Sequence, residues 1–451
     1  MPSKSGPTDQ SARLELNLDR QDSTDPPLTE TTCPEPVEPI SSQRQQWHAG
    51  ATAEATTATK DEAARTPSPA PTLLSPHATH LYTLSYLIFF SIFGTLARLG
   101  LQALTFYTSA PVVTGVLWAN VGGSLIMGFL SEDRNLFREE WGRKPSAPPK
   151  DSTEAAEQSK NHKAVKKTIP LYIGLTTGFC GCFTSFSSFI RDVFLALANA
   201  LPNPSLSDAG DPIASRNGGY SFMALVAVIL LTVSLSLSAL IFGAHLALAL
   251  AKFTPTVPFA LTRRVLDRVI VLLGWGCWLG AVFLAIWPPD RGSGDGETWR
   301  GRAVFACVFA PVGCLLRFYL SLHLNARIPA FPLGTFTTNI FGTVVEGLCF
   351  DLQHVSGLGA GVPAALTGCQ VLQGVMDGFC GSATTISTWV AELNGLSKRR
   401  YAYVYGVTSV VVALGFLIVI MGSLLWTRGF DEAVAEPSFP RPASAFGPGV
   451  P

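Results

Sequence analysis

Apolar residues along the chain gather into nine runs that are separated by polar segments. The runs cover approximately residues 81–106, 111–131, 170–200, 219–251, 266–287, 303–325, 332–353, 363–395 and 401–427. A helix needs about 20 apolar residues to cross the hydrocarbon core of a bilayer. The pattern therefore predicts an all-α integral membrane protein with nine spans.

The two ends of the chain lack such runs. Residues 1–79 are rich in Pro, Ser, Thr and acidic side chains, and residues 428–451 are short and rich in Pro. Neither segment can bury enough apolar surface to offset its chain entropy, so we predict two disordered tails. No apolar stretch follows the first Met, so we expect no signal peptide.

Composition narrows the class of protein further. Apolar residues make up 47% of the chain and charged residues 14%, whereas a soluble chain carries about 25% charge. This excludes a soluble enzyme, a disordered chain and a disulfide-rich secreted module. Lys plus Arg and Asp plus Glu both number 32, so no basic excess indicates nucleic acid. We interpret the Cys residues as small buried hydrophobes.

Basic residues are unevenly distributed among the predicted loops. The segment 132–169 is rich in Lys and Arg, and 252–268 and the residues after 395 add more. The opposite loops are sparse, except for 288–302, which carries three Arg. Cytoplasmic loops are enriched in Lys and Arg. We therefore predict a cytoplasmic N-terminus and, with an odd number of spans, an extracellular C-terminus.

The chain also contains an internal repeat, which is best sought early. At a shift of 219 residues, Gly94, Leu96, Arg98, Leu101, Gly115, Asn120, Gly123 and Gly128 coincide with Gly313, Leu315, Arg317, Leu320, Gly334, Asn339, Gly342 and Gly347. At a shift of 200, Gly174, Gly178, Phe179, Cys180, Gly181, Thr184 and Ser187 coincide with Gly374, Gly378, Phe379, Cys380, Gly381, Thr384 and Ser387. Chance similarity between apolar segments would match Leu and Val rather than these types.

Each copy then has four spans, and one span lies between the copies. We assign residues 80–252 to the first copy, 253–290 to a linker with one transmembrane helix, and 291–427 to the second copy. A single linking helix inverts the second copy relative to the first. Inverted repeats place their sites at the repeat interface near the bilayer midplane.

The segment from Gly178 to Phe189 is the clearest polar stretch inside a predicted span. Gly weakens a helix by about 1 kcal/mol relative to Ala, so we predict that the third helix of each copy is broken. Carbonyls freed by a break can hold a cation. The alternative is a packing face of small residues. Phe186 and Phe189 share a helical face, and their positive edges could stabilise an anion, unless they face lipid or the core.

Four further polar residues lie within predicted spans. Asn120 and Asn339 have amide hydrogens that can donate to an anion, or they can join helices. Arg98 and Arg317 are costly in a membrane. As a repeated pair, they are interpreted as anchors of the fold.

Three motifs occur twice: G-x-x-x-R, N-x-x-G-(S/T)-x-x-x-G and G-F-C-G-x-x-T-(S/T)-x-S-(S/T). They resemble the Fluc/CrcB fluoride channel family over roughly residues 80–427. The fused two-copy layout resembles the eukaryotic fluoride exporter form of that family. The resemblance implies two antiparallel four-helix units, two pores, and one central structural Na⁺ bound by backbone carbonyls at the breaks.

Carried over by motif, the resemblance also implies the residues of each site. The sodium ligands would be the carbonyls of Gly181, Thr184, Gly381 and Thr384. The pore residues would be Asn120, Phe186, Ser187, Ser188, Phe189, Asn339, Ser387 and Thr388, with Tyr405 and Ser409 as candidates in the last helix.

The second copy departs from the family pattern. Ile386 and Trp389 stand where the ring motif expects two Phe, so this box is interpreted as degraded and the two pores as unequal. Glu346 aligns with Met127, and an intramembrane carboxylate indicates function by default. It either pairs with a polar neighbour or seals a vestigial pore. Asp192 and Glu392 also align and are interpreted as structural.

The resemblance implies a passive, fluoride-selective channel that exports cytoplasmic fluoride across the plasma membrane and so gives fluoride resistance. No nucleophile–base pair or cofactor loop is visible in the sequence, so we expect no enzyme. The expected partners are the fluoride ion and the lipid bilayer, with no nucleic acid, and the chain is expected to be a monomer that acts as a pseudo-dimer. The alternatives are an inverted-repeat secondary transporter, coupled through Glu346 or Asp377, and a non-transporting scaffold.

Overall fold

The computed structural model describes most of the predicted membrane region. It covers residues 76–138 except 106, 108, 109 and 113, and residues 164–202, 217–288, 303–355 and 363–430. All of these belong to one compact unit, Cys33–Pro451. Of the two predicted disordered tails, 1–79 and 428–451, residues 1–75 and 431–451 lie outside the described residues. Residues 76–79 are helical, because α2 begins at Pro76, so the first predicted tail extends four residues too far.

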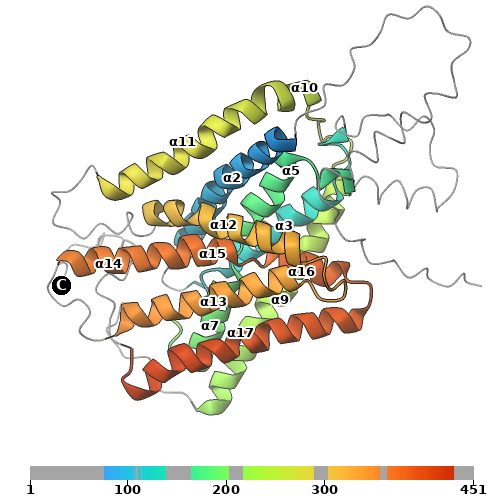
Figure 1. Ribbon diagram of the computed structural model, residues 1–451. Helices are drawn as coiled ribbons and strands as arrows, with labels where there is room; N and C mark the ends of the chain where they lie inside the picture. Colours follow the sequence, from blue (N-terminus) through green and yellow to red (C-terminus); the bar gives the residue numbers. More distant parts are fainter. Residues whose placement is uncertain are drawn as a thin grey trace, which may run out of the picture. The chain divides into compact units, whose positions relative to one another are not determined.

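Every regular element in the described part of the chain is helical, as predicted (Figure 1). The first copy comprises α2 (Pro76–Thr105), α3 (Leu117–Glu132), α5 (Pro170–Ile173), η2 (Gly174–Cys180), α6 (Gly181–Phe183), α7 (Phe186–Leu197) and α9 (Gly218–Ala249). The linker comprises α10 (Phe259–Leu261), η3 (Thr262–Leu266) and α11 (Asp267–Ile286). The second copy comprises α12 (Phe305–Leu324), α13 (Leu333–His354), α14 (Pro363–Gly374), η5 (Val375–Cys380), α15 (Gly381–Ala383), α16 (Ser387–Gly395) and α17 (Arg399–Thr427).

The third segment of each copy is interrupted at the same motif position. Thr184 has ψ 151° and Thr384 has ψ 156°, which are extended rather than helical values. A π-helical stretch, η2 or η5, comes shortly before each interruption. Short π-helical segments occur frequently at functional sites.

Six helices among the described residues are long and apolar enough to cross a membrane. They are Pro76–Thr105, Pro170–Leu197, Gly218–Ala249, Phe259–Ile286, Phe305–Leu324 and Arg399–Thr427. The other three predicted runs are helical but shorter or more polar. For example, α3 has 16 residues, and α13 buries Asn339 and Glu346. The count of nine spans therefore stays a prediction.

The outer faces are apolar, and the interior contains many buried polar side chains beside its apolar clusters, which suits a lipid environment. Leu272 on α11 is 75% exposed and Val419 on α17 is 70% exposed. Buried positions, in contrast, include Asn120, Thr184 and Ser187. In a soluble protein the large apolar side chains would be mostly inside.

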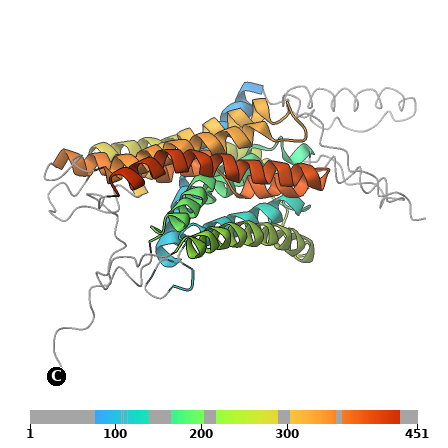
Figure 2. The ribbon, with the colours of Figure 1, turned by 90° about the horizontal axis from the view of Figure 1, so that it is seen from below.

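The two copies contact each other through several pairs of helices. Helix α2 packs against both α11 and α12, so the linker helix lies against the first helix of the chain. Helices α3 and α9 lie side by side (Figure 2), as do α13 and α17. Across the copies, α7 packs against α13 and α17, and α16 packs against α3 and α9. Each half-helix that follows an interruption therefore contacts the other copy.

Candidate functional site

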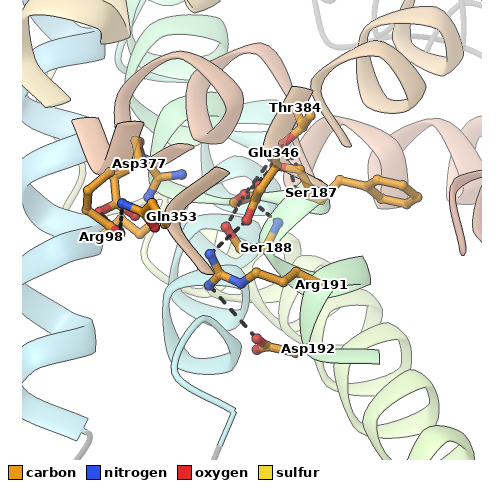
Figure 3. Close-up of polar contacts among 12 residues, drawn as sticks. Arg98, Ser187, Ser188, Arg191, Asp192, Glu346, Gln353, Asp377 and Thr384 are labelled. Carbon is orange, nitrogen blue, oxygen red and sulfur yellow. Dashed lines mark hydrogen bonds and ion pairs between the residues drawn. The ribbon is translucent and has the colours of Figure 1, made fainter. Parts of the chain in front are cut away.

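The π-helical stretch before each interruption is bound by an arginine from the opposite copy. Arg98 on α2 donates through Nη2 to the backbone carbonyl of Asp377 (Figure 3). Arg317 on α12 donates through Nη2 to the carbonyl of Thr177 at 2.8 Å. Both arginines are buried, and residues 177 and 377 occupy equivalent positions in the repeat. This placement agrees with the predicted role of the two arginines as anchors of the fold.

Glycine makes room for these guanidinium groups. A Cβ atom on Gly181 would overlap the Arg317 guanidinium, and one on Gly381 would overlap that of Arg98. Nη1 of Arg98 is buried without a hydrogen-bond partner among the described residues. Two positive charges therefore lie directly beside two of the four residues predicted to hold sodium.

The two threonines at the interruptions cap helices of the opposite copy. Thr384 Oγ1 accepts hydrogen bonds from the backbone N–H groups of Phe186 at 3.2 Å and Ser187 at 3.1 Å. Thr184 Oγ1 accepts from those of Ile386 at 3.2 Å and Ser387 at 3.1 Å. A side-chain oxygen at a helix start satisfies donors that have no partner within the helix. Each copy thus completes the N-terminus of the other copy's half-helix.

Further hydroxyls join this centre. The Ser187 hydroxyl lies 3.0 Å from Thr384 Oγ1, and the Thr184 and Thr385 hydroxyls lie 3.1 Å apart. The Ser187 and Thr384 side chains are seen together in Figure 3. Ser387 donates through Oγ to the Cys180 carbonyl at 3.1 Å. The sequence assigned Thr184 and Thr384 to a sodium site and Ser187 and Ser387 to the pores, and the structure brings the hydroxyls of all four together.

The two asparagines clamp the backbone just after each interruption. Asn120 accepts from the Ser185 N–H at 2.9 Å and donates to the Ser185 carbonyl at 3.3 Å. Asn339 makes the same pair of bonds with Thr385, at 2.9 and 3.4 Å. This geometry fits the alternative of joining elements within the fold. A pore role for either amide would rest on its second N–H hydrogen.

The ring motifs of the two copies pack together. The Phe186 ring lies 5.8 Å from that of Phe189 and 5.4 Å from that of Trp389, in edge-to-face arrangements. Ile386 is buried in the same apolar cluster. Phe186 therefore contacts the opposite copy's motif as closely as its own. The predicted pore residues Ser188 and Thr388 follow the same local pattern in the two copies. The backbone N–H of each donates to the hydroxyl three residues earlier, that of Ser185 or Thr385.

The two predicted residues of the last helix belong to a separate network. The Tyr405 hydroxyl donates to Glu392 Oε2 at 2.8 Å, and Ser409 donates to the Tyr405 carbonyl at 2.7 Å. Glu392 Oε1 also accepts from Thr335 Oγ1 at 2.6 Å and from Asn325 Nδ2 at 3.3 Å. The carboxylate is thus surrounded by donors, which agrees with a structural role for Glu392.

Sequence reasoning missed one charged residue. Arg191 on α7 pairs with Glu346 on α13 at 2.9 Å and lies 4.0 Å from Asp192 (Figure 3). Of the two readings of Glu346, the structure supports pairing. An arginine inside an apolar span needs a partner, and this signal could have linked Arg191 to Glu346.

A known protein family matches the chain in two ranges, one in each copy. The family described as "CrcB-like protein, Camphor Resistance (CrcB)" matches the chain over residues 85–244 and 304–423. The chain belongs to the CrcB family. The resemblance predicted from the sequence is thereby confirmed, and the two matched ranges contain both sets of motifs. With its apolar helices, this CrcB chain is a multi-pass membrane protein.

Several relatives are similar over long stretches. "Fluoride export protein 1" of Neurospora crassa is 58% identical over 371 residues, which covers 79% of this chain and 69% of the relative. "Fluoride export protein 1" of Candida albicans is 36% identical, covering 76% and 79%. The "Fluoride-specific ion channel FluC" of Burkholderia orbicola is 33% identical over 129 residues, covering 28% of this chain and 93% of the relative. No solved structure shows significant similarity to this CrcB chain.

The bacterial relative is informative because of its length. It is matched over nearly its whole length by about a quarter of this chain. One copy of the CrcB unit in this chain therefore corresponds to a whole bacterial protein. In this chain the two units meet at the centre formed by Thr184, Thr384 and the half-helices that they cap.

Proposed function

We propose that this CrcB chain is a passive, fluoride-selective channel that exports cytoplasmic fluoride across the plasma membrane. The relatives are named for fluoride export and for a fluoride-specific channel. The observation that carries the proposal is the pair of matched copies whose interrupted helices cap each other at a buried, hydroxyl-rich centre. Hydroxyl donors and ring edges suit a small anion that must bind weakly enough to leave.

A passive pore is sufficient for this task because of acid–base chemistry. Hydrogen fluoride is a weak acid that crosses bilayers uncharged and ionises in a near-neutral cytosol. An inside-negative potential then favours anion exit by about 2.3 kcal/mol per charge per 100 mV. The proposal needs no catalytic group, and it assigns fluoride resistance to the cell that carries the channel.

The same proposal includes the arrangement in the membrane. Nine spans would place the second copy upside down relative to the first, with α11 as the inverting helix. The distribution of basic loops favours a cytoplasmic N-terminus and an extracellular C-terminus. One chain would then act as a monomeric pseudo-dimer in the bilayer, because it contains both matched copies.

The proposal also includes one structural Na⁺, and the residues at the interruptions fit such an ion. Thr184 and Thr384 are fully buried, and their extended ψ angles turn their carbonyls away from the helix axis. Carbonyl oxygens are suitable ligands for a hard cation. The Arg317 and Arg98 guanidinium groups lie against Gly181 and Gly381. The threonine carbonyls therefore fit a cation better than the glycine carbonyls do.

Sodium would supply a charge that satisfies these buried oxygens, so it should stabilise the folded protein. Purified protein should unfold at a higher temperature in sodium than in a bulky organic cation of equal ionic strength. Unmet buried carbonyls are costly, which sets the direction of the shift. Equal unfolding midpoints in the two salts would contradict sodium binding.

Liposomes that contain the purified protein test the function itself. A fluoride electrode should record rapid efflux of fluoride when a potassium ionophore sets the voltage, and no matching chloride efflux. A secondary transporter coupled through a carboxylate is the alternative. It would respond to an imposed pH gradient at fixed voltage, whereas the channel would not.

A further inference from the structure

Two cysteines from opposite copies lie beside one arginine. Cys182 belongs to α6 of the first copy and Cys314 to α12 of the second, and these two helices pack against each other. Nη2 of Arg317 donates to the Cys182 sulfur at 3.5 Å and lies 3.9 Å from the Cys314 sulfur. Both cysteines belong to the same small cluster of buried residues. The two thiols are therefore direct neighbours where the copies meet.

Hydrogen-bond donors surround the Cys182 sulfur. Besides the Arg317 guanidinium, its neighbours are the Cys314 thiol and the Ser382 hydroxyl. Such donors and a nearby positive charge stabilise a sulfur that carries negative charge, and the thiolate is the form of cysteine that attacks oxidants and disulfides. A cysteine that only fills the core behaves as a small hydrophobe among apolar groups. The surroundings of Cys182 thus favour reactivity rather than packing alone.

The equivalent site in the repeat carries hydroxyls instead of thiols. The shift of 200 residues aligns Cys182 with Ser382. The shift of 219 residues aligns Cys314 with Thr95. The Thr95 and Ser382 hydroxyls lie 3.0 Å apart and join α2 of the first copy to α15 of the second. Both sites therefore connect the copies through a pair of side chains, but only the thiol pair can be oxidised.

We propose that Cys182 and Cys314 are a redox pair, which a small hydroperoxide converts into a disulfide bond between the two copies. The inference goes beyond transport, because it concerns a covalent link within the chain and not the path of an ion. It assigns to Cys182 the role of the attacking thiol, because Arg317 donates to its sulfur at the shorter distance.

The reaction balances with hydrogen peroxide as the only oxidant. The Cys182 sulfur attacks one peroxide oxygen, the O–O bond breaks, and the departing hydroxide takes up the thiol proton to become water. The Cys314 sulfur then attacks the resulting sulfenic acid, the S–O bond breaks, and a second water leaves with the Cys314 proton. Two thiols lose two electrons, and one peroxide gains them. Both side chains are 0% exposed, so the site suits a compact oxidant and excludes a bulky thiol reagent.

Mass spectrometry of the oxidised full chain tests the proposal. Purified protein in liposomes is treated with hydrogen peroxide, its remaining thiols are blocked with N-ethylmaleimide in denaturant, and the chain is digested. We expect a crosslinked pair of peptides that joins Cys182 to Cys314, and dithiothreitol added before blocking should remove it. Cys277 and Cys307 are another pair of neighbouring thiols. Absence of the Cys182–Cys314 crosslink in folded protein, or a crosslink of Cys277 to Cys307 alone, would overturn the proposal.

Two variants that copy the other half of the repeat are the matched controls. Cys182→Ser and Cys314→Thr each introduce the residue that the aligned position already carries, so both should fold. Each should abolish the crosslink under the same oxidation. A crosslink from the remaining cysteine of the pair to a different thiol, formed as fully as in the wild type, would show that the two cysteines are not specific partners.

The unfolding midpoint provides a second readout that needs no transport. A disulfide that closes a long loop constrains the unfolded chain, so oxidised wild type should unfold several degrees above the reduced protein. Cys314→Thr should show no such difference, and an equal shift in this variant would contradict the assignment. A protein that forms the crosslink but conducts no fluoride would overturn the proposed function alone. A protein that conducts fluoride without forming the crosslink would overturn this inference alone.

Discussion

The centre of the molecule and its two flanks follow different rules. At the centre, the two copies make equivalent contacts with each other: Arg98 binds the Asp377 carbonyl, and Arg317 binds the Thr177 carbonyl. The flanks differ, since Glu346 faces Arg191 on one side and the aligned position on the other side is Met127. Pseudo-symmetry is therefore kept at the two interruptions and is lost at the flanking contacts of α7 with α13 and of α16 with α3.

The two copies also differ in how closely their own helices pack, α3 with α9 in the first copy and α13 with α17 in the second. A Cβ on Gly128 would overlap the backbone carbonyl of Leu240, because α3 and α9 touch backbone to backbone. The aligned Gly347 on α13 faces only side chains of α17, with Leu417 Cδ2 2.6 Å from a built Cβ. Small residues let membrane helices approach closely, and only the first copy depends on this to such a degree.

The largest effect is expected from substituting the glycine at each of these two helix contacts. Gly128→Ala should destabilise the protein by about 3 kcal/mol or more, because a backbone carbonyl cannot rotate away as a side chain can. Gly347→Ala should cost about 1 kcal/mol or less, since Leu417 can shift to another rotamer. Unfolding midpoints and the yield of monodisperse protein measure both.

Gly280→Ala provides the control for these two variants, because nothing lies within 4 Å of a Cβ built there. It should behave like the wild type. Similar losses for Gly128→Ala and Gly347→Ala would show that the two helix pairs pack alike, which contradicts the comparison.

The ring motifs give the next largest effect. Phe186→Ile should reduce fluoride flux by at least about tenfold, because Phe186 packs its ring on Trp389 of α16 and Ile has no ring edge. The swap changes volume little, so stability should be nearly kept. Ile386→Ala should be tolerated better in the same liposome assay, with flux expressed per folded protein. If Ile386→Ala is the more damaging, the second copy's motif carries the conducting ring.

Replacing either capping threonine by valine tests the symmetric centre and should have a smaller effect on stability. Thr184→Val and Thr384→Val each remove an acceptor for two backbone N–H groups of the opposite copy. Loss of a helix cap costs about 0.5–2 kcal/mol, and the two variants should lose nearly the same stability. A clear difference between their unfolding midpoints would mean that the centre is as unequal as the flanks.

Much of this architecture could be predicted because its signals are local. The interruption of each third segment follows from Gly and hydroxyl residues inside an apolar run, and Arg98 and Arg317 stand out as charges within predicted spans. The repeat then pairs these features. Such signals depend on residue type and spacing, which the sequence contains in full.

Partners across the two copies could not be predicted in this way. The Thr384 hydroxyl caps a helix that begins about 200 residues earlier in the chain, and no local pattern reports this. For the Asn120 amide the sequence left open a pore role and a role in joining helices, and its partner, the backbone of Ser185, became evident only in the structure. Glu346 stood out in the sequence, but its partner Arg191 became evident only when α7 and α13 were placed together.

Current recorded across a planar bilayer tests the central claim most directly. With purified protein, a tenfold fluoride gradient and equal pH on both sides, a passive fluoride channel should reverse its current at about 59 mV, the value for one charge per tenfold gradient. Adding a pH gradient should leave that potential unchanged, and replacing fluoride by chloride should abolish the current. A reversal potential that moves with the pH gradient, or one that stays at zero in the fluoride gradient, would contradict the account.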